Sequence, residues 1–293
     1  MREPATSAIL SQGFRIAIAA AFFGTVASAL VGWGGASAAN WGAENGAVDA
    51  APETVAPEDS ELETVRLATL RWPPYTSDVL PEEGAATSVV RAAFATQHHD
   101  VEVQFWPWNR AIAKARDGDE RIIAYFPGYH CRHDPRGDFI RSDAVGATPL
   151  GFAEHTQAPQ NWKTLEDLTD KRVGTVLGYA HTEEFDQRID EGIQRVITSS
   201  NDIANLLKLA DRQIHFAAID RFVMAYVLST EEALQPHRDA LRFHDRPLGQ
   251  TALYLCFRND ATGQELRRIF NAGLQEIDAE ALLLDYVNRL VKP

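Results

Sequence analysis

Residues 65–105, VRLATLRWPPYTSDVLPEEGAATSVVRAAFATQHHDVEVQF, contain the pattern that decides the fold. The run VRLAT at 65–69 is typical of a β-strand, and the two prolines of the following W-P-P-Y at 72–75 cannot continue a central strand. The next apolar residues share one face of a helix: Val89, Val90, Ala93 and Phe94. Three more alternate as in a strand: Val101, Val103 and Phe105. Strand, helix and strand in this order predict a βαβ unit.

The rest of the chain repeats this alternation. Further strands are expected at residues 122–126, 172–177, 214–219 and 253–257. Helices are expected from Pro107 to Gly118, at 164–168, around 185–189, from a Ser200 cap through 203–210, at 266–277 and at 281–291. Such alternation predicts an α/β fold with mostly parallel sheets, in which ligands bind beyond the carboxyl ends of the strands.

The composition is that of a folded, acidic protein. The 293 residues include 28 Lys and Arg against 41 Asp and Glu, a net charge of -13. Because this surplus of acids repels phosphates, we expect no nucleic acid partner. With 45% hydrophobic residues, the chain is able to bury a core in one large or two moderate domains. Two cysteines exclude a disulfide-rich scaffold but leave one disulfide open.

The first residues read as an export signal. Residues 16–33, IAIAAAFFGTVASALVGW, carry no charge, follow Arg2 and Arg15, and run into an A-S-A motif at 36–38. This order is typical of a cleaved signal peptide, here residues 1–38, and predicts a periplasmic location. The alternative is an uncleaved membrane anchor, because 18 uncharged residues are just long enough to span a bilayer.

Residues 39–63 are expected to form a flexible, acidic linker. They contain seven acids, no Lys or Arg, and almost no large apolar side chain besides Trp41. Such a composition buries too little surface to offset the entropy lost on ordering. Folding should begin near Thr64.

Few motifs in the chain carry chemistry on their own. There is no G-x-S-x-G elbow, Walker loop or G-x-G-x-x-G. His130, Cys131 and His133 lie within four residues, but without a companion ligand motif we expect neither a metal nor a cofactor. In an oxidising compartment Cys131 and Cys256 are candidates for a disulfide, since each lies in or at the end of a predicted strand. The sequence does not supply the Cα separation that decides this pairing.

Several separate segments, taken in order, resemble one family. They are RWPPYT (71–76), VEVQFWPWNRAIAKARDGD (101–119), FPGYHCRHDPR (126–136), NWKTLEDLTDKRVGTVLGYAHTEEFD (161–186), IHFAAIDRFVMAYVL (214–228) and LGQTALYLCFRND (248–260). In this order they resemble the periplasmic solute-binding proteins of polar amino-acid ABC transporters, the family 3 extracellular solute-binding proteins of the type II periplasmic binding fold. The resemblance covers the chain from about Val65 to the C-terminus.

The resemblance implies two doubly wound α/β lobes joined by two crossover strands, which close around a small molecule. Lobe 1 would hold residues 64–148 and 248–293, and lobe 2 residues 149–247. It also implies a carboxylate-binding role for Arg136, since a guanidinium forms two parallel hydrogen bonds with a carboxylate. The alternative is a surface arginine paired with Asp134 or Asp138.

Five further candidates follow from the resemblance, four of them with a structural alternative. Asp220, directly after a predicted strand, would accept the ligand's ammonium, and it also suits the N-cap of the next helix. Trp72 would line the ligand or pack in the core. Tyr75, Trp108 and Arg110 are weaker candidates of the same kind, because Trp108 also suits the core and Arg110 suits pairing with helix acids.

A last group lies where a predicted strand of lobe 2 leads into a helix. Backbone N–H groups at Gly178, Tyr179 and His181 would be free to hold an anion at the helix start. The family often has a hydroxyl residue just after this glycine, whereas Tyr179 stands here. His133-Asp134-Pro135-Arg136 likewise departs from the usual T-x-x-R, and Tyr129 and Cys131 replace small hydroxyl residues. The cleft should therefore be more aromatic than that of a typical polar amino-acid binder.

These observations predict an exported, monomeric solute-binding protein, not an enzyme. It would capture a small, polar, carboxylate-bearing, amino-acid-like molecule between two lobes and deliver it to an ABC permease. One alternative is an exported enzyme similar to cyclohexadienyl dehydratases, with Glu183, Glu184 or His181 as the general acid. Another is a sensory ligand-binding domain, tethered if residues 16–33 stay in the membrane.

Overall fold

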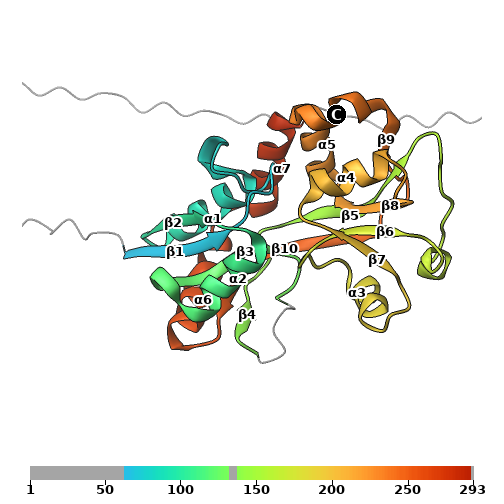
Figure 1. The fold of residues 1–293 in the computed structure, drawn as a ribbon. Coiled ribbons are helices and arrows are strands. Elements are labelled where there is room, and N and C mark those ends of the chain that lie inside the picture. The colour runs from blue at the N-terminus through green and yellow to red at the C-terminus, as the bar shows by residue number, and fades with distance from the viewer. Residues whose placement is uncertain (1–62, 132–136, 292–293) are drawn as a thin grey trace, which may run out of the picture. The chain divides into compact units, whose positions relative to one another are not determined.

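The computed structural model describes residues 63–131 and 137–291 (Figure 1). Its strands are β1 (Glu63–Thr69), β2 (His99–Phe105), β3 (Ile122–Gly128), β4 (Phe139–Arg141), β5 (Gly146–His155), β6 (Val173–Val176), β7 (Val196–Ser199), β8 (Phe216–Asp220), β9 (Leu241–Phe243) and β10 (Gly249–Arg258). Its α-helices are α1 (Ala85–Thr96), α2 (Trp108–Asp117), α3 (Glu183–Asp190), α4 (Asp202–Ala210), α5 (Arg221–Thr230), α6 (Ala261–Leu274) and α7 (Ala279–Leu290). Short 3₁₀ segments lie at Pro81–Glu83, Asp119–Arg121, Leu165–Leu168 and Glu232–Ala240.

The strands form two lobes, which are called the first lobe and the second lobe in chain order. In the first lobe, β1 pairs in parallel with β2 and β3. In the second lobe, β6 pairs in parallel with β7 and β8. Strand order along the whole path is β2-β1-β3-β10-β5-β8-β6-β7. The two long strands β5 and β10 lie side by side in the middle of this order and connect the lobes (Figure 1).

Within the described residues, every antiparallel pair involves one of these two crossover strands. β10 pairs with β3 and β4 in the first lobe and with β5 near the centre. β5 pairs with β8 and β9 in the second lobe. The prediction of two α/β lobes with parallel strands and two crossovers is therefore confirmed, whereas the lobe boundaries at residues 148 and 248 stay a prediction.

Helices cover both faces of the second lobe, as a doubly wound sheet requires. Alternate residues of β8 point to opposite faces. Phe216 packs in a cluster with Phe185 of α3, whereas Ile219 packs in the main core with Leu206 of α4 and Val223 of α5. In Figure 1, α3 accordingly lies on one side of these strands, and α4 and α5 lie on the other.

Most expected elements are present, with shifted ends. The strand and helix between residues 172 and 190 and the two C-terminal helices lie where the periodicity predicts them. The cap of α4 is Asn201, whose side chain accepts from Ala204 N, and not Ser200 as expected. Glu63 begins β1, so the last residue of the expected linker belongs to the sheet. The rest of that linker and the predicted signal peptide lie outside the described residues.

A disulfide ties the end of β3 to β10. Cys131 and Cys256 are bonded, with their Cα atoms 5.6 Å apart across 125 residues of sequence. The pairing that the sequence left open is thus made. Because Cys131 has no free thiolate, it is not available to the metal site weighed for His130, Cys131 and His133, and His133 lies outside the described residues.

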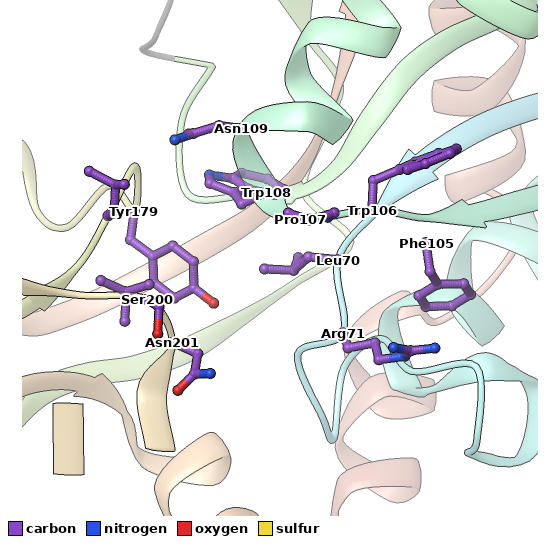
Figure 2. A pocket seen from close by; sticks show the side chains of 12 residues that line it. Leu70, Arg71, Phe105, Trp106, Pro107, Trp108, Asn109, Tyr179, Ser200 and Asn201 are labelled. Carbon is purple, nitrogen blue, oxygen red and sulfur yellow. The ribbon is translucent and has the colours of Figure 1, made fainter. Parts of the chain in front are cut away.

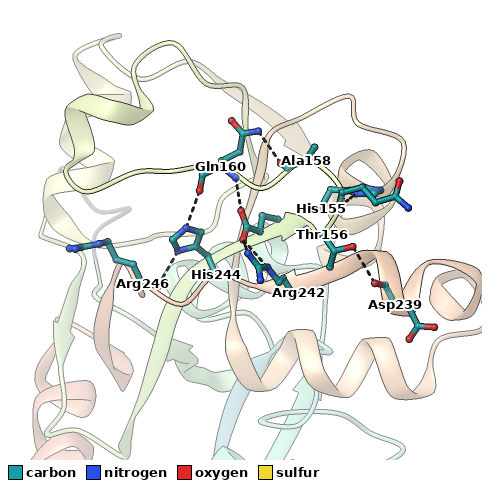
Figure 3. A network of polar contacts seen from close by, with 10 residues as sticks. His155, Thr156, Ala158, Gln160, Asp239, Arg242, His244 and Arg246 are labelled. Atoms are coloured by element: carbon teal, nitrogen blue, oxygen red, sulfur yellow. Dashed lines mark hydrogen bonds and ion pairs between the residues drawn. The ribbon is translucent and has the colours of Figure 1, made fainter.

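A second anchor lies in the outer part of the second lobe, around Glu154 of β5. Its carboxylate accepts from Gln160 N at 2.8 Å and from Arg242 Nε at 2.9 Å (Figure 3). His244 Nε2 lies 3.1 Å from Gln160 O in the same network. These bonds fasten the loop after β5 to β9, which carries Arg242.

Between residues 63 and 131, and between 137 and 291, no helix has the length and apolar composition that crossing a membrane requires.

Candidate functional site

A small, mostly aromatic chamber lies where the carboxyl ends of the central strands meet. Leu70 and Trp72 follow β1, Tyr129 follows β3, and Trp108 begins the helix after β2. Tyr179 reaches it from the second lobe, just after β6. The centre of a water-sized sphere can move through about 30 Å³ of the chamber. This is the edge at which an α/β sheet binds ligands.

Two tyrosine rings of the chamber make edge contacts with the ring of Trp72. The ring of Tyr129 lies 5.8 Å from that of Trp72, at an interplanar angle of 75°. Tyr179 lies 6.4 Å from Trp72 at 81°. Tyr75 stacks on Trp72 at 4.7 Å. Trp72 therefore presents its ring as one wall of a box, with Tyr129 and Tyr179 as two perpendicular walls.

Three contacts join the lobes across this cleft. The indole of Trp108 donates to the carbonyl of Gly178 at 3.0 Å. Tyr75 Oη donates to Asp220 Oδ1 at 3.1 Å. His130 Nε2 lies 3.4 Å from Asp186 Oδ2. The lobes are therefore held in a closed arrangement.

Gly178 is required by this closure. Its φ is +82°, and a Cβ placed on it would lie 2.1 Å from Asn109 Oδ1 of the opposite lobe. Only a residue without a side chain adopts this backbone without strain and lets Trp108 approach the carbonyl.

A wider cavity of about 410 Å³ continues outward from the chamber. Leu70, Trp108 and Tyr179 line both spaces, and Figure 2 shows these three side chains facing one hollow. Arg71 lines the outer cavity, as does Asn201. The outer space thus presents a guanidinium and an amide that the chamber lacks.

Asp220 lies beneath the chamber, enclosed by its own hydrogen bonds. Oδ1 accepts from Tyr75, from Phe222 N at 2.8 Å and from Val223 N at 3.1 Å. Oδ2 accepts from the hydroxyl of Thr148, which also contacts Tyr75. Asp220 is 2% exposed, and Tyr75 and Thr148 are fully buried. Burial raises the pKa of Asp220 to about 6.

A second buried acid touches the wall of the chamber. Asp202, the first residue of α4, accepts from the hydroxyl of Tyr179 at 3.3 Å. Burial raises its pKa to about 7, and the charge of Asp220 adds to that rise. Burial likewise raises the pKa of Tyr179 and Tyr129 well above the usual value. The floor of the cleft is therefore acidic, buried and short of cations among the described residues.

The predicted anion site after β6 holds the chain's own acid instead. His181 N donates to Asp186 Oδ2 at 2.9 Å, and His181 Nδ1 lies 2.8 Å from Oδ1. Burial acts to raise the pKa of Asp186, but hydrogen bonds from His130 and His181 hold it well below its usual range. His181 is buried at this contact and does not line the chamber.

The structure brings together only part of the predicted site. Trp72, Trp108 and Tyr179 meet in the chamber, and Gly178 forms a closing contact. Tyr75 and Asp220 lie behind Trp72 as a buried pair, with Asp220 also in its alternative role as N-cap of α5. Arg110 is exposed, and its guanidinium lies 4.5 Å from the centre of the Trp106 ring, away from the chamber. Arg136 lies outside the described residues.

Sequence reasoning missed three residues of the cleft. Tyr129 was noted only as a departure from the family pattern, although it follows a buried strand and a Pro-Gly pair. Asp202 follows a helix cap, a signal that was placed one residue early. Thr148 carried no local signal, because β5 was not predicted.

Comparisons with known proteins were made by sequence and by structure. No family model matches the chain, and no curated protein sequence matches it. A GluR0 ligand-binding core in complex with L-glutamate is 14% identical at a TM-score of 0.63, with 79% of this chain and 99% of that chain covered. A histidine kinase sensor domain with similarity to periplasmic binding proteins is 15% identical at a TM-score of 0.64, covering 79% and 97%. An amino acid ABC transporter substrate-binding protein from Streptococcus pneumoniae, bound to L-arginine, is 10% identical at a TM-score of 0.60, covering 78% and 97%.

The chain has a type II periplasmic binding fold. At these identities the likeness extends to the fold and not to the ligand. Within this fold, the chamber between Trp72 and Tyr179 occupies the cleft between the lobes, where the carboxyl ends of β1, β3 and β6 converge.

Proposed function

We propose that the protein is a receptor that binds a small solute between its two lobes. The observation that carries the proposal is the cleft itself. Aromatic side chains from both lobes enclose one chamber, and direct hydrogen bonds join the lobes around it. Such a site supplies binding energy through ring contacts and desolvation, and hinge closure encloses the solute.

The role that we propose is capture of an amino-acid-like, carboxylate-bearing solute in the periplasm, for delivery to an ABC permease. The solved structures named above support it, because two of them hold amino acids and one belongs to an ABC transporter. Arg136 remains our candidate for the carboxylate. Charge-assisted bonds from a guanidinium would give such a contact its strength.

Thermal unfolding of the protein against amino acids, organic acids, amines and other small solutes tests the proposal. A solute at 100 times its dissociation constant should add about 2.7 kcal/mol to the free energy of unfolding. Trp72→Leu should abolish that shift, and Trp162→Leu, which removes a buried indole of the second lobe outside the chamber, should keep it. If no solute stabilises the protein, or if Trp72→Leu keeps the full shift, the proposed site is wrong.

A sensory role is the second candidate, favoured by the likeness to a histidine kinase sensor domain. It uses the same cleft but requires the chain to stay at the membrane. The mass of the exported protein separates the two roles. Loss of residues 1–38 supports a free receptor, whereas retention of residues 16–33 supports a tethered sensor.

A further inference from the structure

The chamber has the form of an aromatic box. Tyr129 and Tyr179 make edge contacts with Trp72, at interplanar angles of 75° and 81° to its ring, and Trp108 lines a further side. Three of these rings come from the first lobe and one from the second, so the box is complete only when the lobes are closed. Faces of Trp and Tyr rings carry partial negative charge and attract cations.

The charges around the box also favour a cation. Among the described residues that line the chamber, none is Lys or Arg, and the one imidazole is that of His130, which lies against Asp186. Asp202 contacts the hydroxyl of Tyr179, and Asp220 contacts Tyr75, which stacks on Trp72. The carboxylate of Asp202 therefore contacts a wall of the box directly, and that of Asp220 lies one ring behind Trp72.

The carboxylate beneath the box does not offer a site for N–H donors. A carboxylate has about four lone-pair positions. Asp220 already accepts from Tyr75, Thr148 and the two backbone amides of α5, and it is 2% exposed. An ammonium with N–H groups would find the Asp220 carboxylate already occupied, and leaving buried donors unpaired is costly. A cation without N–H groups meets no such penalty.

A tyrosine hydroxyl of the box lacks a hydrogen-bond partner among the described residues. The hydroxyl of Tyr129 is buried and has no hydrogen-bond partner among the described residues. Such a group marks a place where a ligand oxygen would be bound. The outer cavity begins at Leu70, Trp108 and Tyr179, so the polar end of a ligand has room to leave the box there.

We propose that the aromatic box of Trp72, Trp108, Tyr129 and Tyr179 binds a quaternary ammonium group whose molecule also carries an oxygen for the Tyr129 hydroxyl. This inference rests on the proposed function and specifies its ligand class. It replaces the N–H ammonium first expected at Asp220 by a fully alkylated one.

Calorimetric titration of the protein with three matched probes tests the inference. The probes are choline, its neutral carbon isostere 3,3-dimethyl-1-butanol, and ethanolamine, which keeps the hydroxyl but carries N–H groups. Choline should bind about 30-fold more tightly than the isostere, the ratio that a desolvated cation–π contact provides. It should also bind at least about tenfold more tightly than ethanolamine, because the N–H groups of ethanolamine find no acceptor.

Variants separate a specific role of the rings from a general loss of structure. Trp72→Leu should bring the choline-to-isostere ratio close to one, and Trp72→Phe should restore part of it. Trp106→Leu, in the outer cavity only, should leave the ratio unchanged. Tyr129→Phe should weaken choline about fivefold and leave tetramethylammonium, which has no oxygen, unaffected.

The outcomes distinguish this inference from the proposed function. Choline binding no tighter than the isostere, or a ratio that survives Trp72→Leu, overturns the quaternary ammonium assignment. If another solute stabilises the protein through Trp72 while choline does not bind, the receptor proposal stands and the box assignment is wrong. If no solute binds at all, both are wrong.

Discussion

Two buried carboxylates in this protein have opposite surroundings. Glu154, 1% exposed, faces the guanidinium of Arg242, whose side chain is half exposed, with its Nη2 at 2.7 Å (Figure 3). Asp220, 2% exposed, is held by hydroxyls and backbone amides, with no cation among its described partners. Glu154 is paired at the edge of the second lobe, whereas Asp220 is buried as an acid at the cleft.

This difference separates a carboxylate that anchors a loop, Glu154, from one that contributes to a ligand site, Asp220. The charge of a carboxylate paired with an arginine is compensated by the guanidinium. Such a carboxylate holds a loop in place and does not attract a further cation. Burial raises the pKa of Asp220, because its hydrogen bonds to hydroxyls and amides only partly offset the loss of solvation, and a cation nearby would favour its charged form. Asp202 and Asp220 together therefore give the cleft a negative floor, at a cost in stability that a bound cation would offset.

The largest expected effect is a pH dependence from the cleft acids. Because the pKa values of Asp202 and Asp220 are raised to about 7 and about 6, the folded protein keeps protons that the unfolded chain has released. Stability should therefore fall as the pH rises from about 5 to 8, by on the order of 3 kcal/mol. The Asp202→Asn, Asp220→Asn double variant should lose this slope in urea unfolding. An unchanged slope would show that these acids do not titrate in this range.

Removal of the Asp220 carboxylate should come next in size. Asp220→Ala takes away the cap of α5 and leaves the hydroxyls of Tyr75 and Thr148 with one partner fewer, so we expect a loss of about 2–3 kcal/mol. Asp220→Asn, which keeps the volume and the cap acceptor, should cost less than half of this in the same unfolding measurement. Equal losses in the two variants would contradict the hydrogen-bond account.

The paired carboxylate should give a smaller effect that is confined to stability. Glu154→Ala frees the half-exposed Arg242 to reach water, so we expect a loss of about 1–2 kcal/mol. Affinity for any solute bound in the cleft should not change. If Glu154→Ala weakened binding in calorimetry as much as Asp220→Ala, the division between anchor and site would fail.

The smallest effect is expected at Gly178. In Gly178→Ala, the positive φ and the approach of Asn109 both oppose closure, at a cost of about 1 kcal/mol, which corresponds to a roughly fivefold weaker affinity. Asn109→Ala in the same chain should recover part of this loss by removing the clash. Full affinity in Gly178→Ala would mean that the cleft does not need this contact.

The fold was predictable because periodicity reports which faces of a segment are buried. Alternation over 101–105 and the apolar face over 266–277 place β2 and α6 without reference to the rest of the chain. β5 was missed, since the residues of its second half, 150–155, are buried on both faces and therefore show no alternation.

The site was less predictable, because its residues meet through tertiary contacts. Trp72 was found from a rigid W-P-P-Y turn, and Asp220 from its place after a strand. The hydroxyl of Tyr75 donates to Asp220, which lies 145 residues further along the chain. Neither local sequence pattern predicts this hydrogen bond. Tyr129 entered only as an exception to a family pattern, and its unpartnered hydroxyl became visible only in the assembled cleft.

The central claim is that a solute bound between the lobes stabilises the closed cleft. Spin labels at Asp117→Cys in α2 and Gln187→Cys in α3, both exposed and on opposite lobes, report the separation directly. Their distance should be measured by pulsed electron resonance without solute and with saturating choline, or with the solute identified by thermal unfolding. We predict that the solute narrows the distribution to the distance of the closed arrangement, and that Trp72→Leu abolishes this change. An identical distribution with and without a saturating solute would contradict the account.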